Sequence, residues 1–228
     1  MRIIFSLLLL GTSLFGQISI PVTPPHVVER FYSLLQEVDQ LFQEEEITYW
    51  AACGSLLGAV RHGAMIPWDD DIDIAILDKD LGKLLSLKKE LAKRGLVLCP
   101  LADYIKIFPI DGEVIDKENN GMHLWKYPFI DIFPMTHIEG KVNFLSHRLR
   151  ATLGQRHWFT KEDMALPLPT LSFGPLQVPV PRNSLTYLKR AYGEDVLEVA
   201  IIEYDHAREK KRERLEFSLS QPLCYVVE

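Results

Sequence analysis

The chain has 228 residues, of which 47% are hydrophobic and 25% charged, and these values exclude a disordered or low-complexity protein. The formal net charge of -6 argues against a dedicated nucleic-acid binder, which would carry a basic stripe. The 3 cysteines are too few for a disulfide scaffold and lack the CxxC spacing of a zinc knuckle. The sequence does not decide whether an exported chain forms one disulfide.

The N-terminal segment differs from the rest of the chain. Met1 and Arg2 precede an apolar stretch over 3–10, which small residues follow. This order predicts that residues 1–16 are a signal peptide or a membrane anchor, with membrane association through residues 1–20. An apolar tail that is disordered or packed on the core is the alternative. Prolines within residues 17–26 indicate a linker to one domain over 27–228.

The first half of this domain shows clear periodicities. Apolar residues at helical spacing from Val27 predict an amphipathic helix that ends near 44–46. Strand formers over 47–53 predict a strand, and a short helix is expected over 56–60 after Gly54 and Ser55. Isoleucines alternate at 72, 74 and 76 and predict a further strand, which a helix from Asp78 to Gly95 follows.

The second half is less regular. We expect strands over 96–99, 104–110 and 129–133, the last of them stopped by Pro134. Residues 141–158 are expected to be helical, and five prolines over 165–183 indicate loops. A helix from Asn183 to Tyr192 and a charged terminal helix over 200–219 complete the prediction.

Four aspartates lie within five residues, at Asp69, Asp70, Asp71 and Asp73. Carboxylates at this density repel one another unless positive charge lies among them. On a strand, alternate side chains share one face and are about 7 Å apart, so that Asp69, Asp71 and Asp73 face the same way. Oxygen ligands at this spacing favour Mg²⁺, Mn²⁺ or Ca²⁺ over zinc.

Three interpretations of this acidic cluster compete. A solvated acidic turn does not account for the apolar face that the alternating isoleucines bury. An EF-hand calcium loop requires Gly where Ile74 stands, and its entering helix would have to pass through Pro67. A metal site for phosphoryl transfer fits best, because Gly54 and Ser55 at a helix start suit a phosphate. Asp131, an acid within an apolar strand, is a further candidate ligand or a salt-bridged structural residue.

The run from Gly54 to Gly63, followed by the run from Ile66 to Ile74, resembles the signature of the LicD family, which includes fukutin and fukutin-related protein. Residues 129–134 resemble the later family segment that carries the third acid, and residues 185–193 resemble a weaker C-terminal element. The resemblance spans roughly residues 30–206.

This resemblance implies an α+β chain with a polymerase-β-like nucleotidyltransferase fold, a mixed sheet flanked by helices. It implies a phosphotransferase that depends on Mg²⁺ or Mn²⁺ and moves a phospho-alcohol, such as phosphocholine or ribitol phosphate, from a CDP-alcohol donor to a glycan hydroxyl. Asp71, Asp73 and Asp131 match the catalytic acids, and Asp69 matches a further acid of the signature, so that all four are expected metal ligands. Asp131 would complete a metal site or accept the proton of the acceptor hydroxyl.

The expected donor-phosphate residues are Gly54, Ser55, Arg61 and Lys106. The structural alternative for Arg61 is an ion pair with one of the aspartates. For Lys106 it is a solvated position on a strand. For the function, the alternatives are a nucleotidyltransferase that moves NMP from an NTP to an acceptor, and an inactive relative that binds nucleotide and metal. We expect a secretory, exported or membrane-anchored protein, or one at the cytoplasmic face of a membrane. The donor alcohol, the acceptor glycan and the oligomeric state cannot be read from the sequence.

Overall fold

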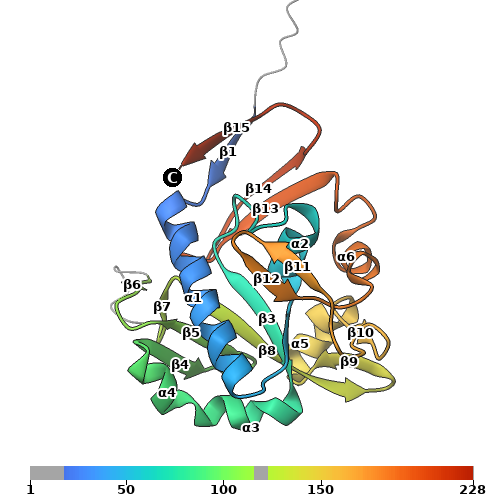
Figure 1. Ribbon diagram of the computed structural model, residues 1–228. Helices are drawn as coiled ribbons and strands as arrows, with labels where there is room; N and C mark the ends of the chain where they lie inside the picture. Colours follow the sequence, from blue (N-terminus) through green and yellow to red (C-terminus); the bar gives the residue numbers. More distant parts are fainter. Residues whose placement is uncertain (1–17, 116–122, 228) are drawn as a thin grey trace, which may run out of the picture.

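The computed structural model describes residues 18–115 and 123–227 (Figure 1). Its helices are α1 (Pro25–Glu44), α2 (Cys53–Arg61), α3 (Asp78–Ser86), α4 (Lys88–Lys93), α5 (His147–Ala151) and α6 (Ser184–Tyr192), with a 3-10 turn at Leu153–Gln155. The strands are β1 (Ile18–Val22), β2 (Tyr49–Ala51), β3 (Ile72–Leu77), β4 (Leu96–Pro100), β5 (Ile105–Pro109), β6 (Glu113–Val114), β7 (Lys126–Tyr127), β8 (Ile130–Ile138), β9 (Lys141–Phe144), β10 (Phe159–Thr160), β11 (Thr170–Phe173), β12 (Leu176–Pro179), β13 (Val199–Asp205), β14 (Lys210–Ser218) and β15 (Leu223–Val227).

A mixed sheet of seven strands forms the centre of the molecule, in the order β10-β9-β8-β3-β2, with β5 also on β8 and β4 on β5. Strands β3 and β8 are parallel neighbours, while β2 pairs with β3 and β5 with β8 in antiparallel fashion. Helix α1 runs across one face of this sheet, and α3 and α4 lie at its lower end in Figure 1. The expected mixed sheet flanked by helices is therefore confirmed.

The core follows from the apolar periodicities of the sequence. Helix α1 buries Phe31, Leu35 and Phe42 along one stripe, as its helical spacing predicts. Trp50 of β2 is fully buried and meets the ring of Phe159 edge-on, at a centroid distance of 6.1 Å. The first half of the domain thus matches its prediction closely, except that two short helices, α3 and α4, replace the single helix over 78–95.

Strand β8 continues past Pro134, where the sequence predicted a stop. Pro134 lies at the point where the antiparallel neighbour of β8 changes from β5 to β9. Its carbonyl accepts a hydrogen bond from the Leu145 N–H at 2.9 Å, and the missing proline N–H faces this junction between two neighbours. The expected helix over 141–158 is confirmed only in part: residues 141–144 form β9 against the extended β8, while α5 and the 3-10 turn at Leu153–Gln155 lie within the rest of the range.

The C-terminal region contains the largest error of the prediction. Residues 199–218 form the antiparallel hairpin β13–β14 and not a charged helix. Ala200, Ile202 and Phe217 are buried with Ile20 of β1 in a small second core, against which Trp68 packs. Burial of this one face outweighs the helix propensity of the Lys, Arg and Glu residues in β14. Part of the expected proline loop over 165–183 likewise forms the hairpin β11–β12.

The two ends of the described chain lie side by side. Residues 18–22, within the expected linker, form β1, which pairs in parallel with β15 (Figure 1). Residues 1–16, the expected signal peptide or anchor, lie outside the described residues. Within 18–115 and 123–227, no helix has both the length and the apolar character needed to cross a membrane.

Gly58 allows α2 to pack closely on its surroundings. A Cβ atom at this position would lie 2.6 Å from the Ala64 carbonyl oxygen and 3.2 Å from Cε2 of Phe173. We expect Gly58→Ala to lower the free energy of unfolding by about 1–3 kcal/mol, the usual cost of overpacking. Gly82→Ala in α3 is the control, because its Cβ would meet nothing within 4 Å. Urea unfolding of both variants measures the effect, and equal midpoints would contradict the packing argument.

Candidate active site

The parallel pairing of β3 and β8 brings the predicted acids together. Asp73 on β3 and Asp131 on β8 are direct register partners, and Asp71 lies just before β3. One carboxylate oxygen from each of Asp71, Asp73 and Asp131 lies within 4.8 Å of the others. All three residues are at most 8% exposed, so their charges are concentrated in a mostly buried space.

The start of α2 holds this acidic cluster from one side. The backbone N–H of Gly54 donates to Oδ2 of Asp73 at 3.1 Å, and the backbone N–H of Asp73 donates to Oγ of Ser55 at 2.8 Å. A Cβ atom on Gly54 would lie only 2.9 Å from Oδ2 of Asp69. A side chain here would therefore displace the Asp69 carboxylate, and glycine lets α2 approach the acids closely. Gly54 and Ser55 thus contact Asp73 directly, in addition to their expected role toward a phosphate.

Lys106 of β5 is fully buried against the third acid and is not the solvated strand lysine that was the alternative. Its Nζ lies 2.8 Å from Oδ1 and 3.0 Å from Oδ2 of Asp131. Glu209 Oε1 lies 3.6 Å away, and the ring of Phe129 has its centroid 3.3 Å from Nζ. The ammonium group therefore balances the charge of Asp131 within the site.

Arg61, at the end of α2, contacts the C-terminal part of the chain. Its Nη1 donates to the carbonyls of Val196 and Val199, at 2.8 and 3.2 Å. Its alternative role, an ion pair with an aspartate, does not occur among the described residues. Burial lowers the pKa of Arg61 to about 10, although Asp69 opposes this shift, so that it stays charged at neutral pH. Arg61, Gly54 and Asp69 line a common cavity of about 420 Å³.

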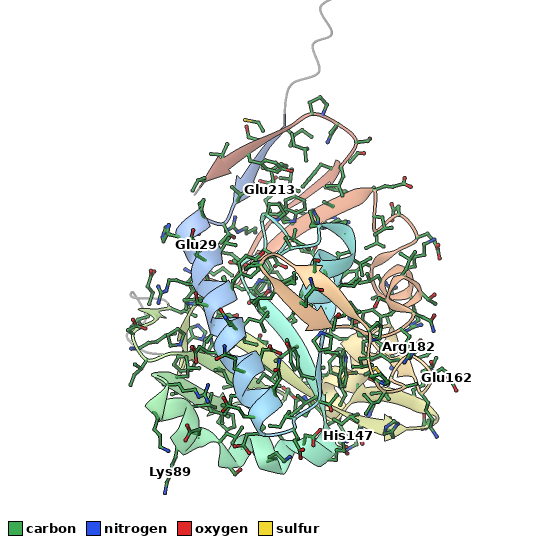
Figure 2. All side chains as sticks on the ribbon, viewed as in Figure 1. Glu29, Lys89, His147, Glu162, Arg182 and Glu213 are labelled. Carbon is green, nitrogen blue, oxygen red and sulfur yellow. The ribbon has the colours of Figure 1, made fainter. Side chains whose placement is uncertain are left out.

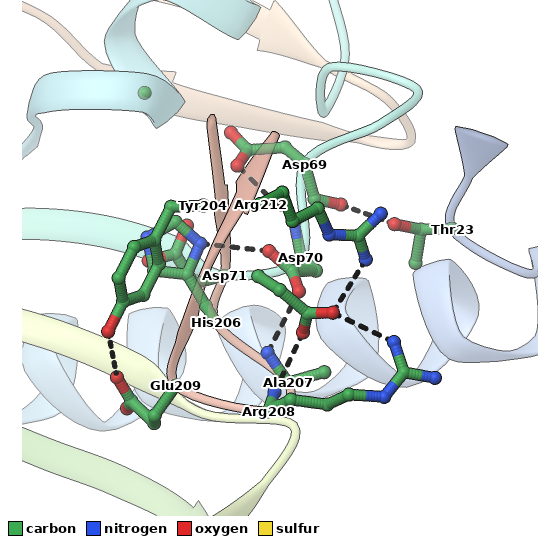
Figure 3. Close-up of polar contacts among 12 residues, drawn as sticks. Thr23, Asp69, Asp70, Asp71, Tyr204, His206, Ala207, Arg208, Glu209 and Arg212 are labelled. Atoms are coloured by element: carbon green, nitrogen blue, oxygen red, sulfur yellow. Dashed lines mark hydrogen bonds and ion pairs between the residues drawn. The ribbon is translucent and has the colours of Figure 1, made fainter. Parts of the chain in front are cut away.

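The turn of the β13–β14 hairpin reaches the acids from the other side, as Figure 3 shows. His206 Nδ1 lies 2.8 Å from Oδ1 of Asp70, and His206 Nε2 lies 3.4 Å from Oδ2 of Asp71. The backbone N–H of Ala207 donates to Oδ2 of Asp70 at 2.8 Å. The sequence analysis missed His206, because a charged helix would have placed it in solvent.

Glu209 of the same turn completes the surroundings of Lys106. Its Oε1 accepts from Nε1 of Trp125 at 3.1 Å. Its Oε2 accepts from the Tyr204 hydroxyl at 3.2 Å, as Figure 3 shows. Sequence reasoning missed this residue as well. Its only signal was an acid within a basic run, which is equally typical of a solvated surface.

Burial and mutual repulsion shift the titration of the cluster. Burial raises the pKa of Asp69, Asp71 and Asp73, and neighbouring carboxylates raise it further. Burial also raises the pKa of Asp131 to about 7, although Lys106 opposes this shift. For His206, burial acts to lower the pKa, but Asp71 and Asp70 outweigh it and raise the pKa to about 11. The site therefore retains protons at neutral pH when no cation is bound.

The residues present fit divalent cations. Two groups share Asp71: one joins Asp71 with Asp73 and Asp131, and the other joins it with Asp69 and His206. Buried Oδ1 of Asp131 accepts no hydrogen bond of good geometry, despite the Lys106 ammonium nearby. A carboxylate shared between two cations about 3.5–4 Å apart is the usual arrangement of two-metal phosphoryl-transfer sites.

This cluster predicts how stability depends on pH. Between pH 6.5 and 8 the unfolded aspartates are ionised, whereas folded Asp131, with a pKa of about 7, still binds a proton in part. The folded state thus binds more protons than the unfolded state, so its stability falls as pH rises. His206, with its raised pKa, adds to this slope. Half-buried His62 and buried His157, whose pKa is lowered to about 4 by burial, act in the opposite direction near pH 6.5, where the unfolded histidines are about half protonated, and this opposition has gone by pH 8.

We expect the melting temperature in chelator to fall from pH 6.5 to pH 8. Added Mg²⁺ or Mn²⁺ should raise it by an amount that grows with pH, because a carboxylate binds the ion only after losing its proton. Differential scanning calorimetry at matched pH values measures both effects. A cation-induced shift that is independent of pH would contradict the assignment of the raised pKa values to ligands.

Two acids at the start of β3, a third on the adjacent parallel strand β8 and a Gly-Ser pair at a helix start are the arrangement expected of the nucleotidyltransferase class. The sequence itself matches the family model described as LicD/FKTN/FKRP, nucleotidyltransferase domain, over residues 46–183. This match covers more than half of the chain and all four expected acidic ligands. The chain therefore belongs to the LicD/FKTN/FKRP family, as its signature predicted.

Characterised relatives share part of the sequence. Ribitol 5-phosphate transferase FKRP of Mus musculus is 29% identical over 77% of this chain and 34% of its own length. Lipopolysaccharide cholinephosphotransferase LicD of Haemophilus influenzae is 43% identical over 18% of this chain and 16% of its own. The chain thus spans about a third of the length of FKRP. The lincosamide adenylyltransferase LnuA, solved with lincomycin, has 15% identity over 65% of this chain and 78% of its own, with a TM-score of 0.41.

Proposed function

We propose that this protein is a metal-dependent phosphotransferase that moves a phospho-alcohol from a CDP-linked donor to a glycan hydroxyl. The observation that carries the proposal is the acidic cluster of Asp71, Asp73 and Asp131 on adjacent parallel strands, beside the start of α2. Family membership supports the same reading, since FKRP is named a ribitol 5-phosphate transferase and LicD a cholinephosphotransferase.

In the proposed reaction, the acceptor hydroxyl oxygen attacks the phosphorus that carries the alcohol. The bond from this phosphorus to the bridging oxygen breaks, and CMP leaves with that oxygen. Divalent cations, Mg²⁺ or Mn²⁺, held by the four expected acids would neutralise the charge on the phosphate oxygens. Asp131 would complete the cation site or accept the proton of the acceptor hydroxyl, a role that needs its carboxylate form.

Two cavities lie beside Asp70, and a transfer between two substrates requires two binding regions. The cavity of about 420 Å³ includes Gly54 at the start of α2, together with Arg61, and we assign it to the donor. A second cavity of about 550 Å³ is lined by Asp70, Tyr127 and Lys210, among others, and we assign it to the acceptor. Trp68 and Asp70 line both cavities, and Asp69 lines the cavity assigned to the donor, so the two cavities meet beside the acidic run.

A donor screen tests the proposed function. The purified chain is incubated with Mg²⁺ or Mn²⁺ and with CDP-choline, CDP-ribitol, CDP-glycerol, nucleotide sugars or a nucleoside triphosphate. Binding is measured by thermal shift, and released CMP or pyrophosphate by chromatography. We expect a cation-dependent shift and CMP release with one CDP-alcohol. Pyrophosphate release from a triphosphate would instead support nucleotidyl transfer, and binding without turnover would support an inactive relative.

Residues 1–16 are part of the proposal for location. We propose that they direct export or anchor the chain at a membrane, on the basis of their charge and apolar order. A CDP-alcohol donor then has to be present on the side of the membrane where the domain lies. Fusion of a reporter after residue 25, followed by membrane fractionation and protease protection, tests this location. A reporter that stays in the soluble cytosolic fraction would contradict it.

A further inference from the structure

Asp70 is the one acid of the run that belongs to neither cation group, and both of its oxygens are used by the hairpin turn. Oδ1 pairs with Nδ1 of His206 and Oδ2 accepts from the backbone N–H of Ala207, each at 2.8 Å (Figure 3). Asp70 is 8% exposed, so these contacts are shielded from water. An ionised carboxylate only accepts hydrogen bonds, and therefore Nδ1 of His206 carries the hydrogen.

This contact fixes which nitrogen of His206 faces the other acids. Nε2 lies 3.4 Å from Oδ2 of Asp71, and the ligand atoms of Asp69, Asp71 and His206 lie within 4.8 Å of one another. A carboxylate behind one ring nitrogen, with the opposite nitrogen directed into a ligand cluster, is the arrangement that metal-bound histidines adopt. Among the described residues, no backbone amide donates to the buried Asp71 carboxylate, which leaves its oxygens available to a cation.

The turn that carries His206 is held firmly in place. Asp205 is buried, accepts from the Arg208 backbone N–H and pairs with the Arg208 and Arg212 guanidinium groups, all at 2.8 Å. Glu209 fixes the other end of the turn through Trp125. His206, Ala207 and Glu209 of the turn are half-buried and Arg208 is exposed, and Figure 2 labels Glu213 farther along β14 of the same hairpin. The imidazole is therefore presented to the acids by the fold and not by a free loop.

We propose that His206 is a nitrogen ligand of the second divalent cation, shared with Asp69 and Asp71, and that Asp70 is the positioning residue that orients its ring. This inference rests on the proposed function, because it concerns the same cation pair. A mixed nitrogen and oxygen donor set favours Mn²⁺ over Mg²⁺, whereas the group of Asp71, Asp73 and Asp131 is all oxygen. The cation takes over the charge balance of the imidazolium, and the Nε2 proton leaves to solvent.

Pulsed EPR of Mn²⁺ on the full chain tests this ligand directly. In excess Mg²⁺, which fills the all-oxygen group, Mn²⁺ is added below one equivalent. We expect the bound Mn²⁺ to show hyperfine coupling to a ¹⁴N nucleus, and His206→Ala to abolish it. His137→Ala is the matched control, because His137 is exposed on β8 and should leave both the coupling and the affinity unchanged.

The role of Asp70 has its own readout. Asp70→Ala should lower the affinity for this Mn²⁺ by about tenfold to a hundredfold, which is the usual effect of removing the residue that hydrogen-bonds to a metal-bound histidine. Asp70→Asn keeps an oxygen acceptor for Nδ1 and should recover most of the affinity and the ¹⁴N coupling. Equal Mn²⁺ affinity in the wild type and Asp70→Ala would overturn the positioning role.

These results separate the inference from the proposed function. If Mn²⁺ binds to the wild type without ¹⁴N coupling, His206 is not a ligand of the cation. CMP release in the donor screen would still support the proposed function. Coupling in a protein that releases no CMP supports the ligand and counts against the proposed reaction. Because the coupling is measured on the wild type, the test does not depend on the folding of a variant. Absence of any Mn²⁺ binding overturns the histidine ligand, and the donor screen with Mg²⁺ then decides the cation-dependent reaction separately.

Discussion

Asp73→Asn should reduce turnover by more than about a hundredfold. Removing a residue that only hydrogen-bonds to a metal ligand already lowers metal affinity or activity by about tenfold to a hundredfold, and Asp73 is an expected ligand itself. Asp73 offers a ligand atom to the group with Asp71 and Asp131, and its side chain is almost fully buried. Asparagine keeps the carbonyl oxygen that accepts from the Gly54 N–H but removes the charge. The rate of CMP release from the preferred CDP-alcohol, at saturating cation, measures the loss.

Asp78→Asn is the matched control for this prediction. Asp78 lies at the opposite end of β3, is exposed and accepts a hydrogen bond from the Thr136 hydroxyl at 2.6 Å. We expect this variant to keep the activity of the wild type. Near-wild-type turnover in Asp73→Asn would remove the acidic cluster from the mechanism, and an unchanged melting temperature in both variants would show that the fold is intact.

Lys106→Met should lower the free energy of unfolding in chelator by about 3–5 kcal/mol, the usual cost of removing one partner of a buried ion pair. Lys106 is 1% exposed and lies between Asp131 and Glu209, so the substitution leaves buried negative charge without its cation. Methionine has a similar length and keeps most of the packing on Phe129. Urea unfolding at pH 8, where the unpaired carboxylates are most costly, measures the effect.

A second variant separates charge from packing. In Lys106→Met combined with Asp131→Asn, both members of the closest pair are neutral, and we expect a smaller loss than the sum of the two single changes. Strictly additive losses would show that the ion pair does not couple the two residues. Leu85→Met, an exposed substitution on α3, should leave stability unchanged and provides the reference for a surface methionine.

The acidic cluster could be predicted because its parts are local in the sequence. Asp71 and Asp73 flank the first residue of a strand whose isoleucines alternate, and Gly54 and Ser55 follow another strand within the same unit. Asp131 was predicted from its apolar surroundings, and only the parallel register of β3 and β8 shows it to be a direct partner of Asp73. The strand order, which decides this register, leaves no local signal in the sequence.

The other side of the site could not be predicted for a physical reason. Residues 199–218 are rich in Lys, Arg and Glu, which favour a helix when considered alone. They form strands because Ala200, Ile202 and Phe217 bury one face against β1 and Trp68, which are distant in sequence. Because of this error, the sequence prediction placed His206 and Glu209 in solvent and not beside the acids. The roles assigned to Arg61 and Lys106 were also incomplete, because their carbonyl and carboxylate partners lie on remote segments.

The pairing of β1 with β15 sets an order of events during synthesis. Strand β1 leaves the ribosome first among the described elements, yet its partner consists of residues 223–227, which leave last among them. The acids likewise emerge long before the turn with His206, and until then they have no imidazole among them. Pairings between distant segments form slowly, since a long loop must close first. A chain that stops before residue 199 contains every predicted acid and Lys106, and still lacks the imidazole that lies against Asp70 and Asp71.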